Sequence, residues 1–161
     1  MSVEKNSNIS VHIKNILIYT LSIYLCVKLY KLVYIYINDI SNSYNKTYFD
    51  LIFPGININS ITQALSHIVF APIIETLIFI TLVFAVLVNK IHKNIFVVMS
   101  SSILFASFHL SINLYTFGYT LLGGFILATY YSKKLKTYGR DVTTLHVVII
   151  HSIYNTISIF A

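Results

Sequence analysis

The sequence predicts an all-α protein, a polytopic transmembrane helix bundle with about five spans and one short interfacial or re-entrant helix. Only 10% of its 161 residues are charged and 57% are hydrophobic, whereas roughly 25% of the residues in a soluble domain are charged. So few charges cannot cover the surface of a soluble fold of this size. The apolar runs show no two-residue alternation, which excludes a transmembrane β-barrel. Composition therefore leaves an integral membrane protein and excludes soluble globular, disordered and fibrous chains.

The N-terminal part, residues 1–60, is expected to contain one transmembrane helix and a polar loop. The helix is predicted over residues 16–37, which are mostly apolar. Lys28 and Lys31 are three residues apart in this run and share one helix face. Their side chains either extend to the lipid headgroups or face a polar interior. Residues 38–60 are polar and include Pro54 and Gly55, which is typical of a loop.

Residues 61–161 are expected to form the functional core. Pro72 interrupts a long apolar run, so we expect an interfacial or re-entrant helix before it and a second span over residues 72–88. Residues 94–132 contain no Asp, Glu, Lys or Arg, and this stretch is long enough for two spans joined by a tight turn near residues 113–118. A basic loop over 133–140 and a final span over 142–161 complete the predicted bundle.

The distribution of positive charge predicts that the N-terminus is cytoplasmic. The net charge is +6, but the lysines lie between apolar runs, so we expect contacts with lipid headgroups and no nucleic-acid partner. With this orientation the outer segments hold only Lys46, and the C-terminus is outside. The cytoplasmic segments then hold Lys5, Lys14, Lys90, Lys93, Lys133, Lys134, Lys136 and Arg140.

Four polar residues inside the apolar runs are candidates for a functional site, because ionisable groups are costly within a membrane. Glu75 is the only acidic residue in any predicted span, and a carboxyl group among apolar side chains can exchange a proton near neutral pH. His151 and Asn155 are four residues apart, so they share a helix face and suit an oxyanion. The predicted topology brings these three residues and His109 into one polar pocket that opens to the outer face.

The remaining histidines are not expected to belong to this site. His146 precedes His151 by five residues, which is about 140° around a helix, so it should point elsewhere. His12, His67 and His92 lie in loops or at interfaces, and we assign them no role. A neutral Glu75 bonded to a neighbouring helix, and a His109 packed in the core, remain the structural alternatives to a functional site.

Three short motifs carry these residues and resemble those of the CPBP family of intramembrane glutamic endopeptidases. This family includes the CAAX prenyl proteases and bacterial proteins linked to bacteriocin processing and self-immunity. Its motifs read roughly Ala-Pro-x-x-Glu-Glu-x-x-x-Arg, Phe-x-x-x-His and His-x-x-x-Asn. The matching segments here are residues 71–75, 105–109 and 151–155, and the small-residue segment 123–128 looks like the family's intervening helix.

The resemblance implies a metal-independent peptidase without a cofactor, in which Glu75 activates a water molecule. His109 would position this water, and Asn155 with His151 would stabilise the oxyanion. The expected partners are the lipid bilayer and a peptide or protein substrate, possibly membrane-associated, and the expected location is the bacterial plasma membrane. Thr76 and Ile80 replace the family's second Glu and its Arg, which puts catalytic activity in question.

Two other functions use the same residues. The two histidines and Glu75 have the chemistry to bind Zn²⁺, with Asn155 as a helper. Alternatively, the chain is a catalytically silent family member that acts in bacteriocin self-immunity or binds a membrane partner, which the departures at Thr76 and Ile80 favour. The motifs of zinc, rhomboid-type serine and aspartyl intramembrane proteases are absent from the sequence.

Overall fold

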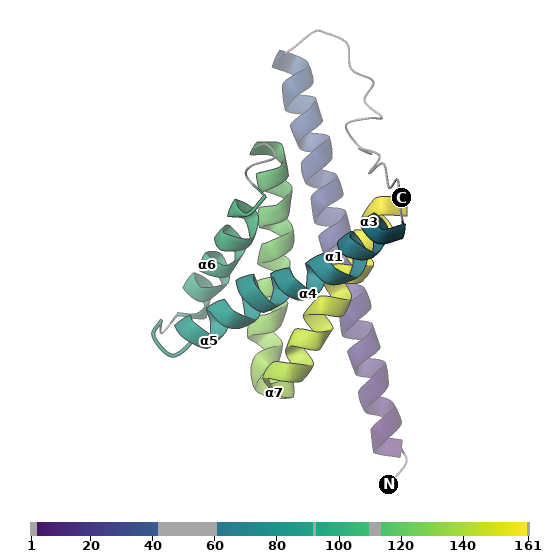
Figure 1. Ribbon diagram of the computed structural model, residues 1–161, viewed down its shortest axis with the longest axis vertical. Coiled ribbons are helices and arrows are strands. Elements are labelled where there is room, and N and C mark those ends of the chain that lie inside the picture. Colours follow the sequence, from purple (N-terminus) through teal and green to yellow (C-terminus); the bar gives the residue numbers. More distant parts are fainter. Residues whose placement is uncertain (1–2, 42–60, 92, 110–113, 161) are drawn as a thin grey trace.

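The computed structural model describes residues 3–41, 61–91, 93–109 and 114–160, and nearly all of these residues are helical. Helix α1 spans Val3–Ser41, α6 spans Asn94–Ser107 and α7 spans Leu114–Phe160. Between α1 and α6 lies a continuous helical run that begins at Ile61 and ends at Leu87. Figure 1 shows α7 beside the long α1, and the 61–87 run packs against α7 and α6. The predicted all-α fold class is confirmed.

Three helices are long and apolar enough to cross a membrane. They cover Ile9–Tyr36, Thr62–Leu87 and Tyr115–Ile159, and a shorter apolar helix covers Asn94–Ser107. The third of these helices is far longer than one span requires, because roughly 20 residues cross the hydrocarbon core. Figure 1 shows why: α7 descends, reverses direction and ascends again.

The reversal of α7 is centred on Gly139. Its backbone has φ +77° and ψ 173°, a conformation that glycine adopts without the steric cost other residues meet. The helix continues through residues 133–138 on one side and resumes at Arg140 on the other. The basic loop expected over 133–140 is therefore mostly helical, and the turn is confined to the glycine.

The 61–87 run contains two π-helical segments that flank the short helix α4. Its elements are α3 (Ile61–Leu65), η1 (Ser66–Phe70), α4 (Ala71–Glu75), η2 (Thr76–Leu82) and α5 (Val83–Leu87). Pro72 is the second residue of α4, and α4 directly follows η1. We expected a kink or a new helix start at this proline; the helical run continues through it, and no separate interfacial helix precedes the span among the described residues. The wide turn of η1 changes the preceding hydrogen-bond pattern, so that a residue without an N–H fits inside the run.

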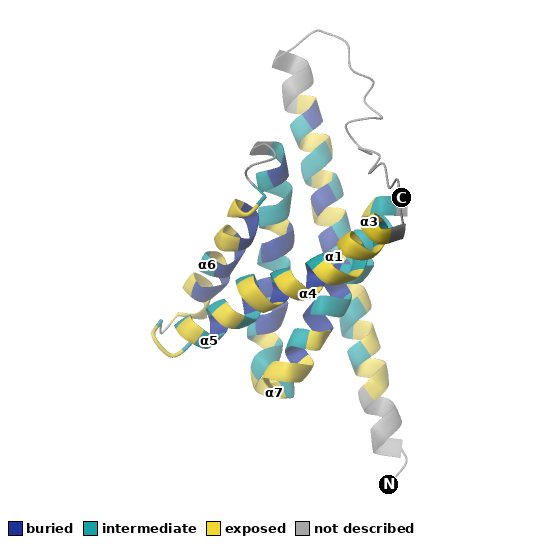
Figure 2. Cartoon of the chain, viewed as in Figure 1, coloured by how far each residue is buried: buried dark blue, intermediate teal, exposed yellow. Residues whose placement is uncertain are grey.

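Side chains are buried where the helices meet and apolar where they face outward. Figure 2 shows buried faces on the sides of α1, α6 and α7 that face one another. On α1, Ile23 and Val27 are buried while Leu21 and Leu25 are exposed. Exposed leucines at these positions are expected where lipid tails replace water as the solvent. The largest fully buried side chains of the core are Tyr130, Tyr131, Ile23, Ile80 and Ile150.

Glycines on α7 allow the neighbouring helices to approach closely. A Cβ atom on Gly118 would overlap the hydroxyl group of Tyr30 on α1. A Cβ atom on Gly124 would lie only 2.9 Å from Cδ1 of Phe105 on α6. Small residues commonly serve this purpose at helix contacts in membranes. The close approach at Gly124 brings α6, and His109 at its end, toward α7.

Candidate active site

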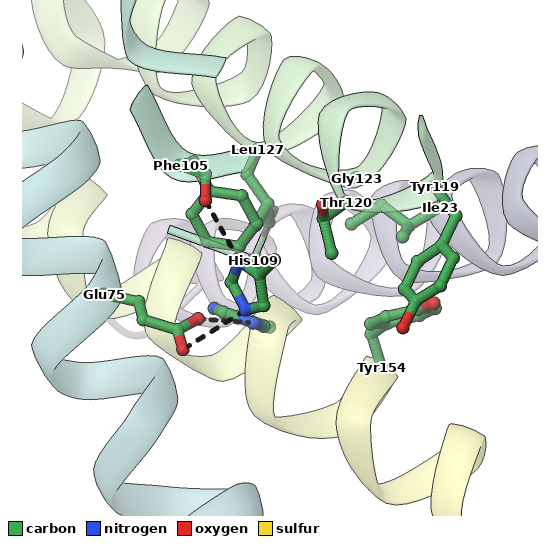
Figure 3. A pocket seen from close by; sticks show the side chains of 10 residues that line it. Ile23, Glu75, Phe105, His109, Tyr119, Thr120, Gly123, Leu127 and Tyr154 are labelled. Atoms are coloured by element: carbon green, nitrogen blue, oxygen red, sulfur yellow. Dashed lines mark hydrogen bonds and ion pairs between the residues drawn. The ribbon is translucent and has the colours of Figure 1, made fainter. Parts of the chain in front are cut away.

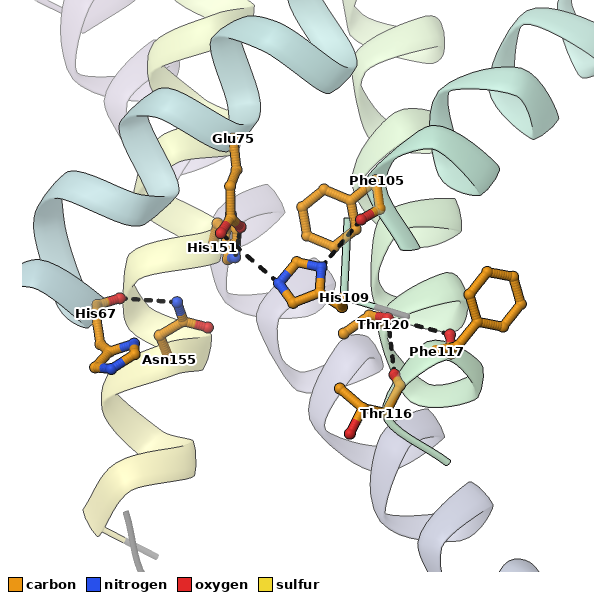
Figure 4. Close-up of polar contacts among 9 residues, drawn as sticks. All are labelled: His67, Glu75, Phe105, His109, Thr116, Phe117, Thr120, His151 and Asn155. Atoms are coloured by element: carbon orange, nitrogen blue, oxygen red, sulfur yellow. Dashed lines mark hydrogen bonds and ion pairs between the residues drawn. The ribbon is translucent and has the colours of Figure 1, made fainter. Parts of the chain in front are cut away.

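Glu75 lies between two histidines that come from different helices. Its Oε1 atom is 3.7 Å from Nε2 of His109, and its Oε2 atom is 3.6 Å from Nε2 of His151. Glu75 is the last residue of α4, His109 follows the end of α6, and His151 belongs to the ascending half of α7. Figure 4 shows the two rings directed at the carboxyl group. Residues 34 and 42 positions apart in the sequence thus form one polar cluster.

A small cavity lies beside this cluster. Its volume is about 60 Å³, and Glu75, His109 and His151 all line it. One water molecule needs roughly 10–15 Å³ of such volume, so the cavity is large enough to hold a water molecule. The side chains of His109 and Glu75 remain 21% and 14% exposed, so part of the cluster lies at the surface of the protein. The other lining residues, most of them drawn in Figure 3, are Ile23, Phe105, Tyr119, Thr120, Gly123, Leu127 and Tyr154.

The backbone of Phe105 fixes the protonation pattern of His109. Nδ1 of His109 is 3.0 Å from the Phe105 carbonyl oxygen, and a carbonyl can only accept, so Nδ1 carries the proton. In the neutral ring the Nε2 atom is then an acceptor that faces Glu75. The Phe105 ring also contacts both imidazoles, with centroid distances of 5.3 Å to His109 and 5.6 Å to His151. The Phe-x-x-x-His spacing therefore positions the histidine and selects its tautomer.

His151 is held more by packing than by hydrogen bonds. The residue is buried, and its Nδ1 atom has no hydrogen-bond partner among the described residues. A buried ring nitrogen without a partner is unfavourable, so this position is retained at a cost in stability. Its Nε2 atom faces Glu75, and the residue lines the cavity.

Asn155 is not part of the cavity lining. Its Nδ2 atom donates to the backbone carbonyl of His67 at 2.9 Å, and Figure 4 shows the amide turned toward η1. The structure therefore brings together three of the four predicted site residues and places the fourth one helical turn away. His67, to which we assigned no role, is linked to the site through its main chain.

Two hydroxyl contacts hold η2 against both helices that carry the histidines. Ser101 of α6 donates to the Phe79 carbonyl oxygen at 2.6 Å. Thr81 and Thr144 of α7 are joined by a hydroxyl–hydroxyl bond of 3.0 Å. Because η2 begins directly after Glu75, these contacts align the carboxyl group with α6 and α7. The sequence analysis missed them, because serine and threonine are ordinary residues in apolar helices.

The two positions that depart from the family motif are completely buried. Thr76 and Ile80 each have 0% exposure, and the Thr76 hydroxyl has no hydrogen-bond partner among the described residues. An unpaired charge at either place would be strongly unfavourable. Because Thr76 and Ile80 replace the Glu and the Arg of the motif together, neither buried position is left with an unpaired charge.

His146 points away from the site, as predicted. Its Nδ1 atom is 2.7 Å from the Tyr130 hydroxyl, and its Nε2 atom is 3.0 Å from Nδ1 of His12. His12 is thus a helix-contact residue of α1, and His92 lies outside the described residues. In the described part of the chain, no group of three or more His, Cys, Asp or Glu side chains is arranged to hold a metal ion.

The comparison with protein families identifies residues 57–157 as an Rce1-like domain, described as type II CAAX prenyl endopeptidase Rce1-like. The match covers more than half of the chain and includes every residue of the polar cluster. The chain belongs to this family. Membership suggests an intramembrane protease that acts on peptide substrates, and the apolar helices of this CAAX protease family member suggest an integral membrane protein. No significant match was found among curated proteins or solved structures.

Proposed function

We propose that this member of the CAAX protease family hydrolyses peptide bonds inside the membrane with a water molecule activated by Glu75. The observation that supports the proposal is the position of this carboxyl group, 3.6–3.7 Å from the Nε2 atoms of His109 and His151 beside a cavity that admits water. A general base must lie within hydrogen-bond reach of the proton that it removes, directly or through one water. Glu75 meets this requirement for a water in the cavity.

In the proposed reaction Glu75 takes a proton from the water, and the resulting hydroxide attacks the scissile carbonyl carbon. His109 accepts a hydrogen bond from the water at Nε2, because its Nδ1–H is directed to Phe105. The tetrahedral intermediate then collapses, the C–N bond breaks, and the proton is delivered to the leaving nitrogen. This chemistry needs no cofactor or metal.

The oxyanion is proposed to rest on His151 and Asn155, with His151 as the nearer donor. His151 lines the cavity, whereas Asn155 does not. The amide of Asn155 carries two N–H groups, of which one is bonded to His67. For its second N–H to support the oxyanion, the side chain must turn toward the cavity. A donor of this kind typically contributes about 10²–10³-fold to the rate.

We further propose the five-span topology with a cytoplasmic N-terminus in a bacterial plasma membrane. Helix α6 and the two halves of α7 would each supply one span, and residues 61–161 would form the protease core. In Figure 1 the N-terminal end of α1, the α5–α6 connection and the bend of α7 lie toward one end of the bundle. The positively charged residues of these segments therefore gather on one side, as the positive-inside rule requires.

The decisive experiment compares the wild type with Glu75→Gln, reconstituted in vesicles, on a peptide library that includes prenylated CAAX peptides. Glu75→Gln keeps the size of the side chain and removes the base, so we expect cleavage to be lost while thermal unfolding changes little. Asp141→Asn is the matched control, because this exposed carboxyl group follows the bend of α7. Wild-type cleavage rates in Glu75→Gln would rule out the proposed base.

A catalytically silent protein that acts in self-immunity or binds a membrane partner is the second candidate. The observation that favours it is that Thr76 and Ile80, both fully buried, stand where the family motif has its second Glu and its Arg. Cells that express the wild type or Glu75→Ala would be challenged with a bacteriocin. Equal protection by both proteins, together with no cleavage by the wild type, would support this candidate over the protease.

A further inference from the structure

A second polar cluster lies where α1 meets α7 near its bend. Nδ1 of His12 is 3.0 Å from Nε2 of His146, and Nδ1 of His146 is 2.7 Å from the Tyr130 hydroxyl oxygen. The ring of Tyr138 packs against both imidazoles, with centroid distances of 4.5 Å to His12 and 5.4 Å to His146. Neither histidine lines the cavity beside Glu75, so the proposed chemistry does not use this cluster.

The cluster joins a helix outside the family domain to the domain itself. Helix α1 spans Val3–Ser41, whereas the family match covers residues 57–157, and α1 packs against α7. Beside the histidine pair, Asn15 of α1 donates to the Tyr138 hydroxyl at 3.4 Å. Residues 9–11, on the N-terminal side of His12, are exposed. The pair therefore lies at the edge of the described contact between the two helices.

Two imidazoles that share a hydrogen bond can hold only a limited number of protons. When both rings are neutral, one N–H lies between them, and the other nitrogen of His146 pairs with the Tyr130 hydroxyl. When His146 alone is charged, it donates from both nitrogens, to His12 and to Tyr130, so every contact is retained. When both rings are charged, two N–H groups face each other across 3.0 Å without an acceptor, and the two like charges repel.

The surroundings of the pair do not offset a second positive charge. Lys134 adds another cation, because its Nζ atom lies over the Tyr138 ring at 5.6 Å from the centroid. The phenols of Tyr130 and Tyr138 are neutral in the range where histidine titrates. Lys14 of α1 and Asp141 of α7 are exposed, and in the described part of the chain no ion pair joins either imidazole to a carboxylate. A second proton on the pair is therefore uncompensated.

We propose that His12 and His146 form a pH-sensitive clamp, which holds α1 against α7 while at most one ring is charged and releases it when both are charged. This inference does not rest on the proposed function. A histidine in water takes up its proton at about pH 6.5, and His12 is only half-buried, so protons reach the pair through this ring.

Proton counting gives the direction and size of the effect. At low pH the two released rings bind two extra protons, whereas the clamped pair holds one. The released form is therefore favoured as the pH falls, and it is lost as the pH rises. A difference of one proton changes the ratio of released to clamped protein by about ten-fold per pH unit below about pH 6.

The distance between the two helices tests the clamp in the full chain. Spin labels are attached to Ile9→Cys on α1 and Thr137→Cys on α7, both exposed positions, and Cys26→Ser removes the native thiol. The protein is reconstituted in vesicles and measured by double electron–electron resonance from about pH 8 to about pH 5. We expect one short distance at the upper end, and a longer distance whose population relative to the short one grows about ten-fold per pH unit below about pH 6.

Variants decide whether the histidine pair is responsible. His12→Asn keeps an acceptor oxygen for His146 but cannot be charged, so the short distance should persist at every pH. His67→Asn is the matched control, because it removes an exposed imidazole of η1, and it should keep the pH response of the parent. A parent distance that does not change with pH, or an unchanged response in His12→Asn, would overturn the proposal.

A second measurement does not depend on any variant at the pair. Nitrogen NMR of the parent with isotope-labelled histidine reports the protons on each ring. We expect at most one charged ring in the clamped form and two in the released form. Two charged rings at the short distance would overturn the proposal. Because neither measurement uses cleavage, a failure here is distinguishable from a failure of the proposed protease activity.

Discussion

Gly124 of α7 lies directly against the ring of Phe105, with space for a hydrogen atom but not for a methyl group. A Cβ atom at this position would lie 2.9 Å from Phe105 Cδ1 and 3.4 Å from its Cβ, so the whole side chain would have to move. The Phe105 ring contacts the rings of His109 and His151, and its carbonyl oxygen accepts a hydrogen bond from Nδ1–H of His109. The contact between Gly124 and Phe105 therefore sets the position of both histidines.

Gly124→Ala should consequently impair activity more than it impairs folding. Overpacking of this kind costs about 1–3 kcal/mol, and the displaced ring would shift His109 away from Glu75. Gly118→Ala is the control, because its Cβ would overlap the Tyr30 hydroxyl group on α1, whereas Gly118 does not line the cavity. Cleavage rates and thermal unfolding of the two variants would be compared with the wild type. Equal activity in both variants would show that the Phe105 contact does not position the site.

Ser101 should matter more than its neighbour Ser102, although both are fully buried. Ser101 bonds to Phe79 in η2, whereas Ser102 bonds to Val98 in its own helix. Ser101→Ala removes the hydrogen bond between α6 and η2, which typically contributes about 0.5–1.5 kcal/mol. We expect a lower unfolding temperature and a lower kcat in Ser101→Ala, recovery in Ser101→Thr, and little change in Ser102→Ala. Similar losses in both alanine variants would remove the special role of the contact with η2.

His151→Ala and Asn155→Ala should differ in severity. His151 faces the cavity and Asn155 donates to the His67 carbonyl, so we expect the histidine to be the main oxyanion donor. Removal of such a donor typically lowers kcat by about 10²–10³-fold, and the loss in Asn155→Ala should be smaller. Steady-state kinetics with the same peptide give both values. A larger loss in Asn155→Ala would reverse the two roles.

Chelation separates the glutamic mechanism from the zinc alternative. We expect purified protein treated with EDTA to retain its cleavage rate, because Glu75 itself supplies the base in the proposed reaction. Metal content would be measured by mass spectrometry on the same sample. Loss of activity on chelation that returns with Zn²⁺ would instead mean that the Glu75, His109 and His151 cluster binds a catalytic metal ion.

The part of the site that sequence analysis anticipated consists of residues whose chemistry is unusual inside a membrane. Glu75, His109 and His151 are conspicuous because ionisable groups are rare in apolar helices, and the structure brings them together. The orientation of Asn155 toward His67 was not foreseeable, because helix periodicity gives the face of a side chain and not the partner that it selects.

Backbone features and hydroxyl contacts were harder to anticipate. The two π-helices around Glu75 have no residue signature, and Pro72 indicated a break where the structure has a wide turn. Ser101 and Ser102 have identical chemistry and adjacent positions, so only the packed structure shows which one reaches another helix. The reversal at Gly139 was expected as a longer basic loop, because lysines alone do not show whether a segment is helical.

The two oxygen atoms of Glu75 face different histidines, one on each side of the carboxyl group. On the proposed mechanism, the oxygen that takes the proton from the water stays in the cavity between the two rings and delivers the same proton to the leaving nitrogen. The side chain then has no need to swing between the attack step and the departure of the amine, so catalysis would proceed in a tightly packed interior with almost no motion of its central residue.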